Sequence, residues 1–101
     1  MVKHIVMWKL ADEAEGASKN SNAKKIRELL YALKTTIPQI KKIEVGMNLR
    51  TGDEYAYDLA LYSEFETVDD LEIYKEHPEH KKVSAFVSKV KTDRAFVDYI
   101  E

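Results

Sequence analysis

The chain contains no cysteine, and this absence excludes several kinds of site at once. There is no disulfide framework, no thiol nucleophile and no thiolate ligand for a metal, and nothing points to an oxidising compartment. A basic excess is missing too, because 16 lysines and arginines stand against 18 acidic residues, giving a formal net charge of −2. A nucleic-acid-binding surface needs the opposite balance, so we expect no nucleic-acid partner.

Long apolar runs and glycine-rich loops are also absent. No run approaches the roughly 20 residues that a membrane-spanning helix needs, so we expect no membrane partner. With three glycines, the sequence shows no phosphate-binding loop, and it has no serine nucleophile elbow or paired-carboxylate motif. The apolar start soon turns polar and lacks a cleavage site, which favours a strand over a signal peptide. We therefore predict one domain over residues 1–101 in a cytoplasmic protein.

What is present is an ordered series of strand and helix patterns. Alternating apolar residues predict strands, and apolar residues three and four apart predict helices. A polar loop over residues 12–22 is expected to end at a helix N-cap, either Ser21 or Asn22, and residues 51–54 predict a hairpin turn. The predicted strands are residues 2–10, 40–49, 55–65 and 94–100; the predicted helices are residues 23–36, a segment beginning at Thr67, and a segment from about 79 to 90 that follows Pro78.

The order β-α-β-β-α-β predicts an α+β fold of the ferredoxin-like, split βαβ type. Its four-stranded antiparallel sheet would carry both helices on one face. We assign one apolar set to the opposite, helix-free face, where only a second copy of the chain could cover it, and so predict a homodimer. A shift of one residue would exchange the two faces. The residues assigned to the helix-free face are Val2, Val6, Trp8, Leu10, Leu59, Leu61 and Phe65.

The segment Tyr74 to His80 concentrates the groups able to carry out chemistry. It holds a phenol and two of the three imidazoles of the chain within seven residues. Imidazole titrates near neutral pH, and a tyrosine hydroxyl can donate a hydrogen bond to a developing oxyanion. On an unbroken helix Tyr74 and His80 would lie on different sides, so both can turn inward only if the helix breaks near Pro78.

Several stretches of the sequence resemble one known family, the stress-responsive A/B barrel (Dabb) domain proteins. Residues 2–10, VKHIVMWKL, resemble the first strand of that family. Phe65-Glu66-Thr67, followed by Leu71, Tyr74 and His77-Pro78-Glu79-His80, is similar to its F-E-S/T … Y … H-P-x-H stretch. Asp98-Tyr99 is similar to the pair that commonly ends its last strand. The resemblance covers nearly the whole chain and implies a dimeric α+β barrel.

The resemblance also implies candidate site residues. Plant relatives include heat-stable stress proteins and a polyketide cyclase that closes a linear tetraketide by aldol condensation without a metal or an organic cofactor. By motif position, the residues that act on substrate in that cyclase correspond to Tyr74 and His80, and its first-strand pocket histidine corresponds to His4. The chain departs from the cyclase at Leu59, which stands where the cyclase has another pocket histidine.

A structural interpretation stands beside this functional one. His77 or His80 could cap backbone groups at a helix corner while Tyr74 packs with its hydroxyl satisfied. Trp8, Tyr57 and Phe65 could line a ligand pocket together with Leu59, or could form a packed core. His4, His77 and His80 could bind a metal, but no nearby carboxylate is clearly a ligand. We therefore expect no metal and no other cofactor.

Two functions therefore stay open. The first is a dimeric barrel of unassigned activity that binds a small apolar ligand. The second is a cofactor-independent lyase or cyclase in which Tyr74 and His80 handle protons. The two differ in one observable, because a catalyst of this kind needs an internal cavity of roughly a few hundred Å³ that reaches His80.

Overall fold

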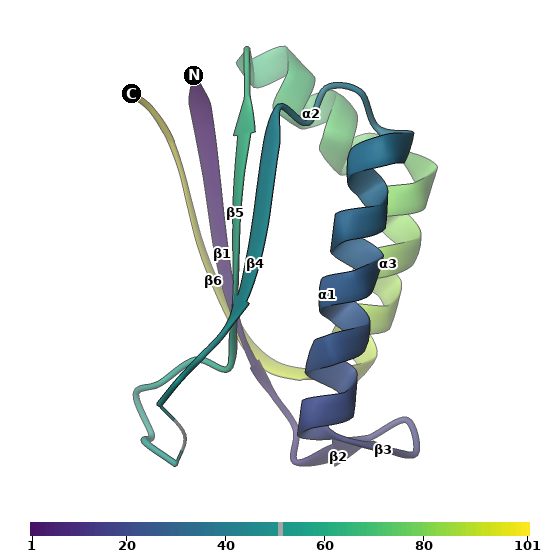
Figure 1. Ribbon diagram of the computed structural model, residues 1–101, viewed down its shortest axis with the longest axis vertical. Coiled ribbons are helices and arrows are strands. Elements are labelled where there is room, and N and C mark those ends of the chain that lie inside the picture. Colours follow the sequence, from purple (N-terminus) through teal and green to yellow (C-terminus); the bar gives the residue numbers. More distant parts are fainter. Residues whose placement is uncertain (51) are drawn as a thin grey trace.

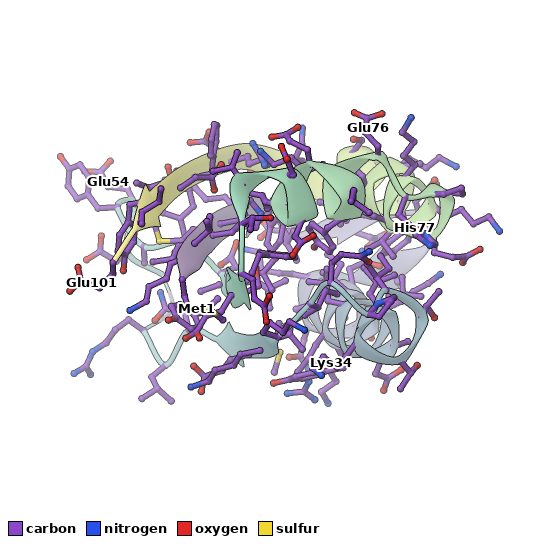
Figure 2. The ribbon with its side chains drawn as sticks, turned by 90° about the horizontal axis from the view of Figure 1, so that it is seen from above. Met1, Lys34, Glu54, Glu76, His77 and Glu101 are labelled. Atoms are coloured by element: carbon purple, nitrogen blue, oxygen red, sulfur yellow. The ribbon has the colours of Figure 1, made fainter. Side chains whose placement is uncertain are left out.

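The computed structural model describes residues 1–50 and 52–101, and it has two layers, a sheet and a set of helices (Figure 1). Seen from above, the helices lie along one side of the sheet (Figure 2). Part of the predicted turn at 51–54, Thr51, lies outside the described residues. The elements are β1 (Val2–Leu10), β2 (Glu13–Ala14), β3 (Ala17–Ser18), α1 (Lys19–Thr36), β4 (Lys42–Met47), β5 (Leu59–Phe65), α2 (Val68–Glu76), α3 (Pro78–Val90) and β6 (Lys91–Ile100).

The main sheet confirms the predicted ferredoxin-like topology. Its strand order is β4-β5-β1-β6, and every neighbouring pair is antiparallel. The first and last strands of the chain therefore lie side by side, with His4 opposite Asp98. β4 and β5 are shorter than predicted, and β6 begins three residues earlier than predicted, at Lys91. Gly46 keeps a regular register opposite Ala60, without a bulge.

The first helix begins earlier than predicted. Ser18 is its N-cap, not Ser21 or Asn22, and the Ser18 hydroxyl accepts a hydrogen bond from the Ser21 amide at 3.2 Å. The predicted loop contains a short β2–β3 hairpin, in which Glu15 and Gly16 both have positive φ. Prediction from apolar spacing missed the first turn of α1 because residues 19–22 carry no apolar side chain.

The second helical stretch breaks where proline predicts. Thr67 caps α2, since its hydroxyl accepts from the Asp70 amide at 3.1 Å, and α3 starts at Pro78. His77 between them is extended, as a residue before proline tends to be. Its ring Nδ1 accepts a hydrogen bond from the Glu79 amide at 3.1 Å, so His77 is the N-cap of α3.

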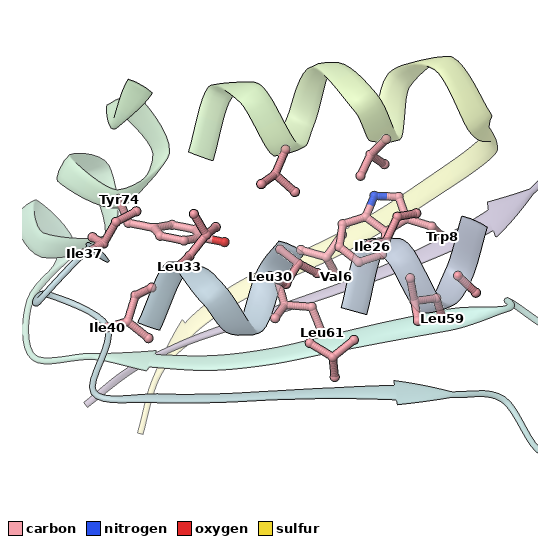
Figure 3. Packing of buried hydrophobic residues seen from close by; sticks show 14 of the residues in the cluster. Val6, Trp8, Ile26, Leu30, Leu33, Ile37, Ile40, Leu59, Leu61 and Tyr74 are labelled. Carbon is pink, nitrogen blue, oxygen red and sulfur yellow. The ribbon is translucent and has the colours of Figure 1, made fainter. Parts of the chain in front are cut away.

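The assignment of the two sheet faces was wrong by one residue of register. The set predicted for the helix-free face lies under the helices and forms the core of the chain itself, with every member at most 6% exposed (Figure 3). The helices need a bulky apolar face beneath their own stripes. The opposite face cannot provide one because charged residues such as Lys3 and Glu64 interrupt it.

The helix-free face is formed by the alternate residues of the same strands. Its apolar part runs across β5, β1 and β6, and several of its side chains are well exposed, including Val97 at 49% and Tyr99 at 40%. Leu49, the last residue of the predicted strand 40–49, lies beyond β4 and is 95% exposed. Among the described residues, no helix is long and apolar enough to cross a membrane. The apolar residues of the helix-free face are Ile5, Met7, Ala60, Tyr62, Ala95, Val97 and Tyr99.

Candidate functional site

A cavity of about 70 Å³ lies between the sheet and the helices. Its apolar walls come from the core, including Val6, Trp8 and Leu61 from the sheet. Its polar groups come from four elements: His4 on β1, Tyr74 on α2, His80, Ser84 and Ser88 on α3, and Lys91 and Arg94 on β6. The cavity reaches His80, as the lyase or cyclase interpretation requires, but it is smaller than the roughly few hundred Å³ expected for such a catalyst.

The break at Pro78 brings Tyr74 and His80 together. Their ring centroids are 4.4 Å apart, at an interplanar angle of 49°. His4 approaches the same tyrosine from the sheet, with 6.1 Å between ring centroids. The structure therefore gathers all three residues that the family resemblance implies, from three different elements, around one cavity.

Tyr74 is fully buried, and its hydroxyl has no hydrogen-bond partner among the described residues. The structural interpretation expects a partner for this hydroxyl, and the described residues provide none. Burial disfavours the phenolate and raises the pKa of Tyr74 well above its usual value. The group is therefore a protonated donor at neutral pH, available to a ligand in the cavity.

His80 is held in one tautomer. Its Nδ1 lies 3.1 Å from the backbone carbonyl of Lys75. A carbonyl can only accept, so Nδ1 carries the proton and donates it. Burial lowers the pKa of His80 more than this hydrogen bond raises it, so the ring is neutral at pH 7. The remaining nitrogen, Nε2, then has a free lone pair and can act as a base.

His4 is oriented in the same way, by a carboxylate. Its Nδ1 lies 2.5 Å from Asp98 Oδ1, and Lys75 Nζ lies 3.3 Å from Asp98 Oδ2. Burial is the main influence on His4 and lowers its pKa, although Asp98 opposes this effect. Burial would raise the pKa of Asp98, but the hydrogen bonds and charges of His4 and Lys75 outweigh it and lower that pKa. At pH 7 the pair is a neutral imidazole donating to a carboxylate, which again leaves Nε2 as the free nitrogen.

The other predicted ligand residues are dispersed. Trp8 lines the cavity, and Phe65 packs against Tyr74 with ring centroids 5.1 Å apart without lining it. Tyr57 and Leu59 border a separate surface hollow of about 560 Å³ next to the helix-free face. His77 caps α3 and does not line the cavity. Within the described residues, no group of three or more His, Cys, Asp or Glu side chains could hold a metal ion.

Sequence reasoning missed Lys75, Asp98 and Arg94. The sequence marks Asp98 only as part of a terminal motif, and Arg94 only as the start of a strand. Their roles depend on β6 pairing with β1, which places Asp98 opposite His4 and Arg94 opposite Trp8. The alternation of β6 would have indicated this face, had its register with β1 been known.

A family model described as the stress responsive A/B barrel domain matches residues 2–101. The chain belongs to this family. Because the match covers the fold and the site together, the Dabb resemblance of the separate motifs is confirmed for the whole domain. The family match assigns no reaction to this chain.

The relatives of this Dabb chain share its fold, but only some of them are described with a function. A dimeric protein of unknown function and ferredoxin-like fold from Bacteroides fragilis is 40% identical, with a TM-score of 0.87, covering 99% of this chain and 95% of that one. A stress-response A/B barrel domain-containing protein of Arabidopsis thaliana is 28% identical over 82% of this chain. This chain spans only 30% of the length of that Arabidopsis relative. A hydroxynitrile lyase from Passiflora edulis shares the fold, with 18% identity and a TM-score of 0.82, over 99% of this chain and 92% of that one.

Proposed function

We propose that the cavity is a cofactor-independent acid–base site that moves a proton on a small carbonyl compound. The observation that carries this proposal is the unpartnered Tyr74 hydroxyl, buried beside a neutral His80 whose Nε2 is free. A hydrogen-bond donor and a base held together in one cavity are the two groups that enolisation needs.

The proposed step balances without an added reagent. Nε2 of His80 takes a proton from the carbon next to the carbonyl, and the electron pair of that C–H bond forms the enolate. The negative charge moves to the carbonyl oxygen, where the Tyr74 hydroxyl donates a hydrogen bond. Return of the proton from His80 to carbon completes an exchange or isomerisation. Attack of the enolate on a second carbonyl forms a C–C bond and an alkoxide that takes the proton from His80, which completes an aldol reaction, and the reverse of this addition is a lyase reaction.

The size of the cavity favours small substrates over a tetraketide. A volume of about 70 Å³ is roughly what two or three molecules occupy in liquid water. The cavity therefore has room for the reacting end of a molecule and not for a long acyl chain. The polyketide-cyclase alternative is therefore less well supported than a lyase or isomerase. The Passiflora relative carries the name of a lyase on the same fold.

The test is exchange of carbon-bound protons with solvent. Acetone and hydroxyacetone in deuterium oxide, followed by proton NMR, should lose their signals next to the carbonyl faster with the protein than with buffer. His80→Ala and Tyr74→Phe should each slow this exchange by about 100-fold or more. His77→Asn is the matched control, because it lies outside the cavity and keeps a capping side chain.

No exchange above the buffer rate with folded protein would overturn the proposal. The chain would then fit the first sequence-based interpretation, a barrel without catalysis. The hollow bordered by Tyr57 and Leu59 is the better candidate for a small apolar ligand in that case, because its lining is mostly apolar.

The proposed partner is a second copy of the chain bound through the helix-free face. The 40% identical Bacteroides relative is described as dimeric. In this chain, the apolar residues of that face form a band across three strands, and monomeric proteins rarely expose such bands. A cytoplasmic location and a single domain over residues 1–101 stay predictions from the sequence.

A further inference from the structure

We propose that the substrate of this cavity is an anion, a short oxo acid whose carboxylate is bound by Arg94 while its carbonyl reaches Tyr74. This inference rests on the proposed function, because it names the substrate class of the same site. It starts from the charges around the cavity and not from its catalytic residues.

The lining of the cavity contains cations and no carboxylate among the described residues. Lys91 and Arg94 border it from β6, while Ser84 and Ser88 add two hydroxyls from successive turns of α3. Both serines are exposed, which places this group at the mouth of the cavity. The chain as a whole carries a net charge of −2, so a mouth with two cations departs from the average of its surface.

The nearby carboxylates are already occupied. Asp98 accepts from His4 with one oxygen and from Lys75 with the other. Asp93 accepts from the backbone amide of Arg94 itself and from the Tyr57 hydroxyl. In the part of the chain that the structure describes, the Arg94 guanidinium makes no ion pair. Its five donors are therefore available to a carboxylate from outside.

The guanidinium is held in place on the cavity side of β6. Its carbon lies 4.8 Å from the ring centroid of Phe96, the next residue on the same face of the strand. Phe96 is opposite Val6, and Val6 is next to His4 on the helix-facing side of β1. Stacking on Phe96 thus places the arginine fork alongside the strand that carries His4. A planar fork of this kind matches a carboxylate with two parallel hydrogen bonds.

The size of the cavity determines where each end of the substrate can lie. Only the carbonyl end fits within about 70 Å³, so a charged group attached to it must stay at the mouth. The groups at the mouth are those that bind an anion, and the innermost free donor is the Tyr74 hydroxyl. A carbonyl inside the cavity and a carboxylate at its mouth would use both groups, and the shortest molecules that carry both are the 2-oxo and 3-oxo acids.

The experiment compares two ligands of nearly the same size, one charged and one neutral. Pyruvate and its neutral amide, pyruvamide, are titrated into the protein, and amide chemical shifts are followed by NMR. We expect pyruvate to bind at least about tenfold more tightly, because it makes charge-assisted hydrogen bonds that the amide cannot. Acetate serves as the carboxylate without a carbonyl and should bind more weakly than pyruvate.

Variants test whether Arg94 is responsible. Arg94→Gln should remove the preference for pyruvate, and Arg94→Lys should keep part of it, since the charge remains and the fork is lost. Arg27→Gln, on α1 and outside the cavity lining, removes the same charge and should leave the preference unchanged. Circular dichroism confirms that each variant is folded.

The outcomes separate this inference from the proposed function. Equal binding of pyruvate and pyruvamide, no binding of pyruvate, or an unchanged preference in Arg94→Gln would overturn the oxo-acid assignment. If pyruvamide nevertheless exchanges its methyl protons in a His80-dependent way, the acid–base site stands and only the substrate class fails. If pyruvate binds through Arg94 without any exchange, the anion site stands and the proposed catalysis fails.

Discussion

The Tyr74 hydroxyl is the group on which the proposed catalysis depends most. Burying a hydroxyl without a hydrogen bond costs about 1 to 3 kcal/mol, so a core selected only for stability would place phenylalanine at position 74. Tyr74 has the hydroxyl, fully buried, beside two histidines. Active sites are where proteins commonly carry such a cost.

Tyr74→Phe should therefore separate stability from activity. Removing the unpartnered hydroxyl is expected to leave the free energy of unfolding unchanged or to raise it by up to about 1 to 3 kcal/mol. Proton exchange on the substrate should fall in the same variant. Urea denaturation of the two proteins measures the first effect. A loss of more than about 1 kcal/mol would mean that the hydroxyl has a partner in solution and contributes to the fold.

The two cavity histidines should make stability depend on pH. Burial lowers the pKa of both His4 and His80 below the ordinary value of 6.5. The unfolded chain therefore binds protons at pH values where the folded chain does not, and stability falls as the pH drops below 6.5 toward the lowered values. Denaturant midpoints measured from about pH 7.5 down should show this loss, and His80→Gln should reduce its slope. A stability profile that stays flat from about pH 7.5 to below 6.5 would contradict this prediction.

At the scale of elements, the corner between α2 and α3 positions Tyr74 and His80. One proline ends the helical hydrogen bonding, one histidine caps the next segment, and the axis changes direction between Tyr74 and His80. The corner is a local feature, so its sequence signal is local and strong. This explains why the break and both neighbouring helices could be predicted without any knowledge of the sheet.

The cap predicts how His77 will respond to substitution. His77→Ala should lower the free energy of unfolding by about 0.5 to 2 kcal/mol, because the Glu79 amide loses its partner. His77→Asn should preserve most of the stability, since asparagine is a good N-cap. Thermal unfolding of both variants is the measurement. If both lose stability equally, the imidazole makes a contact that the cap does not account for.

Other elements were harder to predict for a physical reason. The strands and their order follow from alternation, but alternation has two phases, and both phases of β1 carry apolar residues. Which phase meets the helices depends on the whole set of strands, where Lys3 and Glu64 exclude one face from the core. Asp98 and Arg94 join the site through the same pairing, so no local pattern marked them.

At the scale of the whole molecule, the two faces of the sheet differ in composition, and our proposals give them different roles. The helix-facing side holds the core and the cavity, and the other side carries the apolar band through which we propose that a second copy binds. Catalysis and assembly would then be encoded on alternate residues of the same strands. Within each strand, a substitution affects one or the other according to the face on which its side chain lies.

This alternation gives a matched pair of variants. Val97→Asp, on the helix-free face and 49% exposed, should dissociate a dimer into folded monomers. Leu61→Asp, on the other face and 2% exposed, should unfold the chain, because it buries a charge in the core. Sedimentation equilibrium and circular dichroism together distinguish the outcomes. An unmodified chain that sediments as a monomer at micromolar concentration would exclude the dimer.

Lys75 connects the helical layer to the sheet through two different kinds of group. Its main-chain carbonyl orients His80, and its ammonium holds the carboxylate that orients His4. An alanine scan reads only the second of these roles, because every residue type brings its own carbonyl. Such a scan would rank Lys75 as a modest surface ion pair, although the main chain at this position sets the base of the proposed reaction. Replacing the amide that joins Lys75 to Glu76 by an ester weakens the Lys75 carbonyl as an acceptor. This change would test the main-chain role of Lys75, which side-chain mutagenesis misses.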